Sequence, residues 1–131
     1  MFVTTMTTDY WEGVKSKHDT VLSPSWTEIE AAITRLNSEM LTMVTLRGEG
    51  EAHLAVGGGG GRYVVYATFD NQKFLTLARG GEGRSKVSLS IGGQMGEYPE
   101  DIVVDGPLAL AAAKSFAESG QVSDHLHWLE K

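Results

Sequence analysis

The sequence predicts an α+β fold in which a mostly antiparallel sheet of about five strands packs against two helices on one face. Two segments with helical periodicity lie in 23–37 and between Asp105 and Gly120. Between them, short runs of alternating apolar and polar residues are joined by short links, which is typical of antiparallel strands. The chain has 131 residues, so we expect residues 1–131 to form a single domain.

The first helix is predicted over 23–37. Ser25 and Glu28 match a capping box, in which the side chain of each residue accepts a hydrogen bond from the backbone of the other. Apolar residues follow at three- and four-residue spacing and form one stripe. They are Trp26, Ile29, Ile33 and Leu36. Residues 1–20 precede this helix; they are Thr-rich and weakly patterned, so we expect a loosely ordered N-terminal segment.

Five runs after this helix have the residue pattern of strands. They are 41–47, 51–56, 62–69, 73–77 and 86–91. A mobile loop is expected at 78–85. Five consecutive glycines occupy 57–61 and invite comparison with a phosphate-binding loop. That motif requires Gly-Lys-Ser/Thr followed by a helix, whereas Arg62 begins a strand pattern here. We therefore interpret the glycines as a hairpin connection.

The second helix has clear boundaries. Asp105 supplies a cap, Pro107 lies near the first helical position, and Gly120 provides a left-handed stop. Residues 126–130 are predicted to add a short edge strand anchored by Trp128. The expected core residues are Trp26, Ile29, Ile33, Val65, Leu89, Leu108 and Phe116.

Composition and charge exclude several classes of function. The chain has no cysteine, which excludes a disulfide scaffold, a thiolate metal site and a cysteine nucleophile. Its formal net charge of −6 disfavours nucleic-acid binding, which depends on Lys and Arg, and favours a basic partner. The sequence has neither a signal peptide nor a membrane-length apolar run. We expect a soluble cytoplasmic protein with no membrane partner.

Catalytic and metal-binding motifs are weak. His125 and His127 would share one face of a strand, but two histidines do not make a metal site, and we interpret them as exposed. Glu100 and Asp101 are adjacent, so on a strand they would point to opposite faces and form a poor acid–base pair. We expect no enzymatic activity, no metal and no cofactor.

The stretch 87–113 has an unusual charge distribution, since it contains no Lys or Arg. Its acidic residues are Glu97, Glu100, Asp101 and Asp105. A glycine-rich segment within it, 92–99, also carries Met95 and Tyr98. Two interpretations remain open here. The segment is either a solvated loop, or a mobile acidic surface with an aromatic anchor for a basic partner.

An ordered set of segments resembles the first-numbered immunity-protein family of bacterial polymorphic toxin systems, from about residue 22 to residue 130. The segments are Pro24-Ser25-Trp26 with Glu28-Ile29-Glu30, the glycine run before Arg62-Tyr63-Val64-Val65, Gly92-Gly93-Gln94, Gly96-Glu97-Tyr98-Pro99, 112–116 and Trp128. The resemblance implies a small α+β protein, encoded beside a toxin, that binds the toxin domain and blocks its active site. Several relatives look like partners of cytidine deaminase toxins that edit double-stranded DNA, and others accompany different toxins. The family implies no shared catalytic residues.

We therefore expect a cognate toxin domain as the partner, with a DNA cytidine deaminase as the favoured class. The acidic chain would occupy the basic groove of such an enzyme. The expected contact residues are Gln94, Met95, Glu97, Tyr98, Glu100 and Asp101, with a second patch at Trp11 and Glu12. The alternative is a small-ligand-binding regulatory β-domain whose glycine loops close over a pocket.

Overall fold

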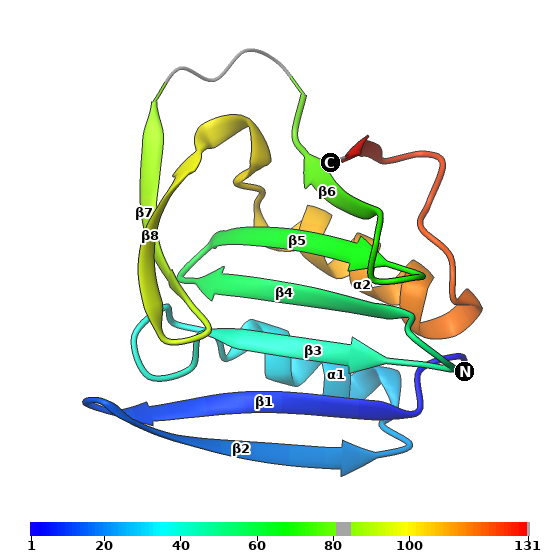
Figure 1. Ribbon diagram of the computed structural model, residues 1–131, viewed down its shortest axis with the longest axis horizontal. Helices are drawn as coiled ribbons and strands as arrows, with labels where there is room; N and C mark the ends of the chain where they lie inside the picture. The colour runs from blue at the N-terminus through cyan, green and yellow to red at the C-terminus, as the bar shows by residue number, and fades with distance from the viewer. Residues whose placement is uncertain (81–84, 131) are drawn as a thin grey trace.

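A computed structural model describes residues 1–80 and 85–130, and it has an α+β fold (Figure 1). The elements are β1 Thr5–Glu12, β2 Lys15–Leu22, α1 Trp26–Thr34, β3 Met43–Arg47, β4 His53–Gly59, β5 Arg62–Thr68, β6 Phe74–Ala78, β7 Lys86–Ile91, β8 Gln94–Pro99, the 3-10 helix η1 Glu100–Ile102, α2 Gly106–Ser119 and β9 His127–Glu130.

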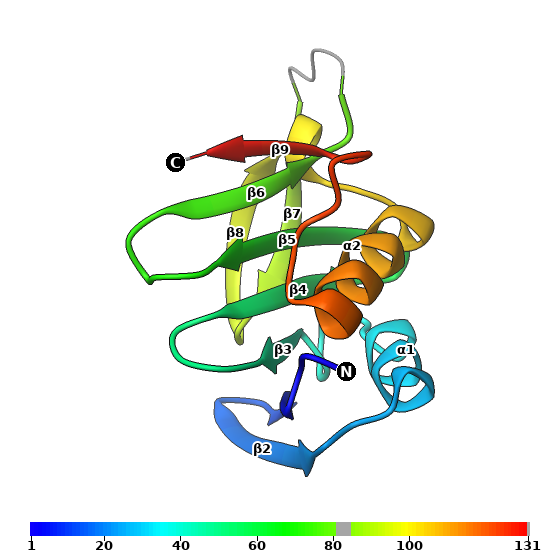
Figure 2. The ribbon, with the colours of Figure 1, turned by 90° about the vertical axis from the view of Figure 1, so that its right-hand side faces the viewer.

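The described strands form one seven-stranded sheet, with the order β2-β1-β3-β4-β5-β6-β9, and a separate two-stranded sheet, β7-β8. Every neighbouring pair in both sheets is antiparallel. Both helices cover the same face of the large sheet, and the β7–β8 hairpin does not lie on that side (Figure 2). The predicted class and the two helices are confirmed, but the sheet has seven strands instead of about five.

The N-terminal segment accounts for two of the additional strands. Residues 5–22 form the β1–β2 hairpin with eight paired positions, and β1 also pairs with β3. The prediction of a loosely ordered segment at 1–20 is therefore wrong. β-Branched threonines favour extended backbone, and Met6 is only 3% exposed beneath the helices. β2 is exposed over most of its length, which explains why its sequence lacks the alternation of a half-buried strand.

Segment 94–99 is also a strand, not the glycine-rich loop that the sequence suggested. Gly92 and Gly93 have φ of 62° and 79°, as a two-residue type I′ hairpin turn requires. They connect β7 to β8, whose six residue pairs are in antiparallel register. The run 86–91 consequently belongs to its own small sheet and does not extend the large one.

The two helix starts follow the predicted caps. The Glu28 amide donates to Ser25 Oγ at 3.2 Å, and the Ser25 amide donates to Glu28 Oε1 at 3.0 Å. The helix itself is Trp26–Thr34, shorter than the predicted 23–37. In α2, the Leu108 amide donates to Asp105 Oδ1 at 3.0 Å, and Gly120 ends the helix with φ 73°.

The core lies between the helices and the large sheet. Phe116, Ile29, Ile33 and Val65 are at most 1% exposed, as predicted. Leu89 is also buried, but it lies on the separate β7–β8 hairpin and not in this core, where the sequence had placed it. Trp26 and Leu108 are instead half-buried at the edge of the core. The Lys114 ammonium group lies over the Trp26 ring, 5.8 Å from the ring centroid.

Two other predicted connections can be compared with the structure. The glycine run forms the end of β4 and the turn into β5, which confirms the hairpin interpretation. The tail forms the edge strand β9, and Trp128 is opposite Leu77 of β6. The mobile loop expected at 78–85 falls partly on residues 81–84, which lie outside the described residues.

Ser25→Ala should lower the free energy of unfolding by about 1 kcal/mol, because the Glu28 amide loses its acceptor. The measurement is urea unfolding followed by circular dichroism. Ser23→Ala is the control, since Ser23 lies two positions before Ser25 and makes no capping bond to the helix. Equal effects of the two substitutions would contradict a specific role for the capping box.

Candidate functional site

The β7–β8 hairpin stands across one end of the large sheet, beside β3, β4 and β5 (Figure 1). Its two faces differ because successive strand residues point in opposite directions. The cross-strand pairs show that Val87, Leu89, Ile91 and Tyr98 share the inner face, whereas Ser88, Ser90, Met95 and Glu97 share the outer face. Leu89 is 5% exposed and Met95 is 70% exposed, so the inner face is turned to the protein and the outer face to solvent.

A buried carboxylate fixes the tip of this hairpin. Asp9 of β1 is 4% exposed, and its Oδ1 accepts hydrogen bonds from the amides of Thr42 at 2.7 Å and Met43 at 2.9 Å. Its Oδ2 accepts from the Thr42 hydroxyl and from Trp11 Nε1, the latter at 2.9 Å. The Thr42 hydroxyl oxygen in turn accepts from the Gly93 amide at 3.0 Å. The network therefore connects β1, the start of β3 and the hairpin turn.

The hairpin turn can lie against Trp11 because Gly93 has no side chain. A Cβ at this position would lie 1.9 Å from the Trp11 ring, far inside van der Waals contact. The Trp11 indole therefore lies directly against the Gly93 position of the turn while its N–H bonds to Asp9. This contact leaves half-buried a tryptophan that the sequence placed in a second contact patch.

Two further contacts attach β7 to the rest of the protein. The Ser90 amide donates to Ser38 Oγ at 2.8 Å, and the Ser38 hydroxyl donates to the Ser90 carbonyl at 3.2 Å. Ile91 lies over Gly57 of β4, where a Cβ would approach Ile91 Cγ2 to 2.3 Å. The first residue of the glycine run thus lets the hairpin approach β4 closely.

An aromatic surface lies beside the hairpin, on the sheet face opposite the helices. His53, Tyr66 and Phe74 come from β4, β5 and β6, with ring centroids 5.8 Å apart for the first pair and 6.0 Å for the second. Tyr98 of β8 and Ile102 of η1 form a wall beside Tyr66 and Phe74. An apolar hollow of about 250 Å³ lies here, and its lining residues are Val64, Tyr66, Phe74, Thr76, Tyr98 and Ile102. We call it the aromatic hollow.

The β5–β6 turn next to Phe74 is held by its own hydrogen bonds. Asp70 Oδ1 accepts from the amides of Lys73 and Gln72, both at 2.9 Å. These amides lower the pKa of the Asp70 carboxyl below its ordinary value, because they stabilise the carboxylate. The Thr68 hydroxyl also donates to the Lys73 carbonyl at 2.7 Å. Phe74, which lines the aromatic hollow, therefore directly follows a turn that is fixed by hydrogen bonds.

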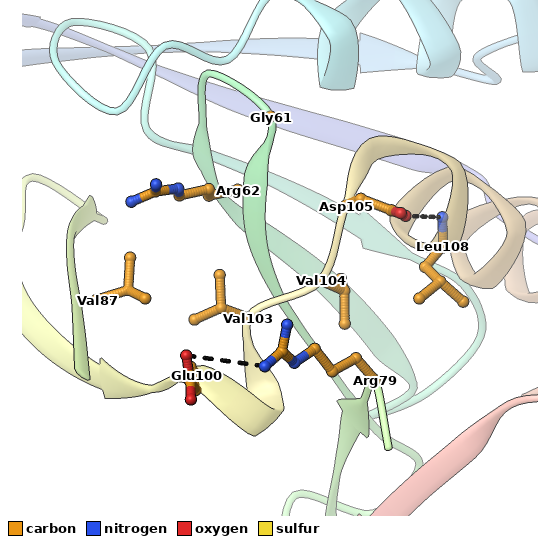
Figure 3. A pocket seen from close by; sticks show the side chains of 9 residues that line it. All are labelled: Gly61, Arg62, Arg79, Val87, Glu100, Val103, Val104, Asp105 and Leu108. Carbon is orange, nitrogen blue, oxygen red and sulfur yellow. Dashed lines mark hydrogen bonds and ion pairs between the residues drawn. The ribbon is translucent and has the colours of Figure 1, made fainter. Parts of the chain in front are cut away.

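A second cavity, of about 340 Å³, lies between the hairpin base, the β4–β5 turn and the start of α2 (Figure 3). Its lining mixes charge and apolar surface. Arg79 Nη2 lies 3.7 Å from Glu100 Oε2, and the Arg79 amide donates to the Asp101 carbonyl at 2.9 Å. These contacts connect η1 to the end of β6, so Glu100 and Asp101 hold the base of the hairpin in position.

The structure separates the contact residues that the sequence grouped together. Gln94, Met95, Glu97 and Tyr98 are all on β8, but Glu97 is on the outer face whereas Tyr98 lines the aromatic hollow. Trp11 reaches the hairpin tip through Gly93. Glu12 is two positions from Tyr10 and on the opposite face of β1 from Trp11, so it does not join the same surface.

Sequence reasoning missed Asp9, Tyr66 and Phe74. A signal was present in 62–69, because Val64 and Tyr66 are apolar at the positions between the core residues Tyr63, Val65 and Ala67. Apolar residues at both parities indicate a strand that is covered on both faces. Among the described residues, no group of three or more His, Cys, Asp or Glu could hold a metal ion.

A protein-family model for the immunity protein Imm1 matches residues 17–130. The chain belongs to the Imm1 immunity protein family. It is thus an immunity protein of a toxin system, and the family indicates an inhibitor role. No curated protein matches the chain. Within the described residues of this Imm1 protein, no helix is long and apolar enough to cross a membrane.

Asp9→Ala should lower the free energy of unfolding by about 3 kcal/mol, because four donors, two of them buried and two part-buried, lose their shared acceptor. Guanidinium unfolding followed by tryptophan fluorescence measures the loss. Asp19→Ala removes an exposed carboxylate of β2; it is the control and should stay within about 0.5 kcal/mol of the parent. A small effect of Asp9→Ala would show that the network is not needed to position the hairpin.

Proposed function

We propose that this Imm1 protein binds a toxin domain of the DNA cytidine deaminase type in the cytoplasm and covers its active site. The family match over residues 17–130 carries the immunity role. The net charge of −6 supports the choice of a DNA-acting partner. An enzyme that holds DNA presents Lys and Arg to the phosphates, and an acidic protein is attracted to that surface over a long range.

The contact surface we propose is the β7–β8 hairpin together with the aromatic hollow. Tyrosine and other aromatic side chains are frequent binding hot spots because they bury a large area at low entropic cost. Tyr66, Phe74 and Tyr98 provide such side chains in one hollow. Met95 and Glu97 project from the other side of the same strand and remain exposed.

The remaining predicted contact residues surround this surface. Gln94 is exposed beside the hairpin turn, and Glu100 and Asp101 are partly exposed at the hairpin base. We include these three residues as the polar rim of the interface. Trp11 contributes by holding the turn, and Glu12 is left as a separate exposed position at the end of β1.

The direct test uses the purified chain and the toxin domain encoded beside it. We expect a one-to-one complex in size-exclusion chromatography and loss of cytosine deamination in a duplex oligonucleotide when the two proteins are mixed. A stable complex with a toxin of another chemistry would overturn the deaminase assignment and leave the immunity role intact. A complex that still deaminates DNA would overturn the proposal that the active site is covered.

Glu97→Lys should weaken toxin binding by roughly tenfold or more, because an acidic contact is replaced by a repulsive one, and the melting temperature should not change. Glu118→Lys is the matched control, since Glu118 is exposed on α2 and its reversal changes the net charge equally. Calorimetric titration and thermal unfolding are measured for both variants. Equal losses of affinity would mean that net charge, not the position of Glu97, controls binding.

A further inference from the structure

β8 has a free backbone edge. In antiparallel pairs, the residues whose backbone groups point to the partner alternate with residues whose groups point away. The Ser90 backbone points away from β8, because its amide and carbonyl bond to Ser38. Met95 is opposite Ser90, and Glu97 is opposite Ser88, two positions further along. The amides and carbonyls of Met95 and Glu97 therefore point outward, and among the described residues they have no backbone partner.

This edge is the least protected of the outer strand edges that the structure describes. β2 carries Lys15 and Lys17, which discourage the addition of another strand. β9 has only four residues, His127–Glu130, and offers a short template. β8 has six residues, with Glu97 as its one charged side chain and Met95 70% exposed. A free edge with an exposed apolar side chain is a template for strand addition.

We propose that an extended segment of the toxin domain adds to β8 as the third strand of the β7–β8 sheet. This inference rests on the proposed toxin-binding function and specifies how the toxin is recognised. Backbone hydrogen bonds to Met95 and Glu97 would provide affinity, as in other complexes formed by strand addition. The contacts that fix the hairpin, from Asp9 through Thr42 to Gly93, hold the edge ready for pairing.

The two faces of the hairpin define the chemistry of that segment. Side chains of an added strand would alternate between the outer face, beside Glu97, and the inner face, beside Tyr98 and the aromatic hollow. On the outer face, Glu97 is the one charged side chain of β8, and Lys86 lies on the same face at the base of β7, opposite Pro99. A basic side chain of the added strand would therefore pair with Glu97, away from Lys86. The structure thus selects a toxin segment in which Lys or Arg alternates with apolar residues.

Proline substitution tests the edge without disturbing the hairpin. Proline is tolerated at a strand position whose N–H points outward, and Pro99 already has this arrangement opposite Lys86. Met95→Pro should remove one outward donor and weaken toxin binding by roughly tenfold or more. Met95→Ala keeps the amide, and Thr20→Pro places proline on the exposed edge strand β2. Thr20→Pro should bind within about threefold of the parent. Met95→Ala loses the same side chain as Met95→Pro, so the roughly tenfold loss is measured relative to Met95→Ala.

Amide hydrogen exchange of the unmodified protein provides a second measurement that does not depend on folding of a variant. In the free protein, the Met95 and Glu97 amides should exchange rapidly, whereas those of Gly96 and Tyr98 are protected by β7. Both outward amides should become protected in the toxin complex. The signals are followed by nuclear magnetic resonance with and without the toxin domain.

The outcomes separate this inference from the proposed function. Strand addition is overturned if Met95→Pro folds and binds as Met95→Ala does, or if exchange at Met95 and Glu97 is unchanged in a complex that forms. Either result would leave the toxin-binding function standing. If the parent protein forms no complex with the toxin domain, the proposed function itself fails. If Met95→Pro does not fold, the exchange measurement alone decides.

Discussion

The position of the β7–β8 hairpin depends on one buried charge. Removing a carboxylate from water is costly unless it is fully hydrogen-bonded, and the Asp9 oxygens meet this requirement with donors from Trp11, Thr42 and Met43. The Thr42 hydroxyl extends the network to the Gly93 amide. Since each donor is directional, the network selects one arrangement of β1, the start of β3 and the hairpin turn, which apolar packing alone would specify less strictly.

The large sheet uses its two faces differently. On the face toward the helices, aliphatic side chains of the strands pack against α1 and α2, including Phe116 of α2. This contact provides the bulk of apolar burial. The opposite face is Thr-rich and aromatic, and the hairpin covers only one end of it. Residues such as Tyr98 consequently serve both structure and surface: the ring rests near Gly96, where a Cβ would be 3.2 Å away, and also lines the aromatic hollow.

A preformed hairpin suits an immunity protein. An inhibitor must bind before the toxin acts, and a surface that is already ordered avoids the entropic cost of ordering on binding. The contacts of the turn with Asp9 and Trp11, of Ser90 with Ser38, and of η1 with Arg79 hold the hairpin at its tip, along β7 and at its base. None of these contacts uses the outer edge of β8. The hairpin can therefore be rigid and still accept an added strand at that edge.

The sequence by itself determined the features that depend on neighbouring residues. The Ser25–Glu28 box, the Asp105 cap and the Gly120 stop each act within a few positions, and alternation at 86–91 identifies β7 without its surroundings. The ordered motifs carried the resemblance to the immunity family, and the net charge of −6 favoured a basic partner. Only tertiary structure decided the rest, because the partners are remote: Asp9 is 33 positions from Thr42, and Thr42 is 51 from Gly93. The strand at 94–99 could not be recognised from the sequence because Gly96 interrupts it and Gly92 and Gly93 precede it. Its pairing with β7 placed Glu97 and Tyr98 on opposite faces.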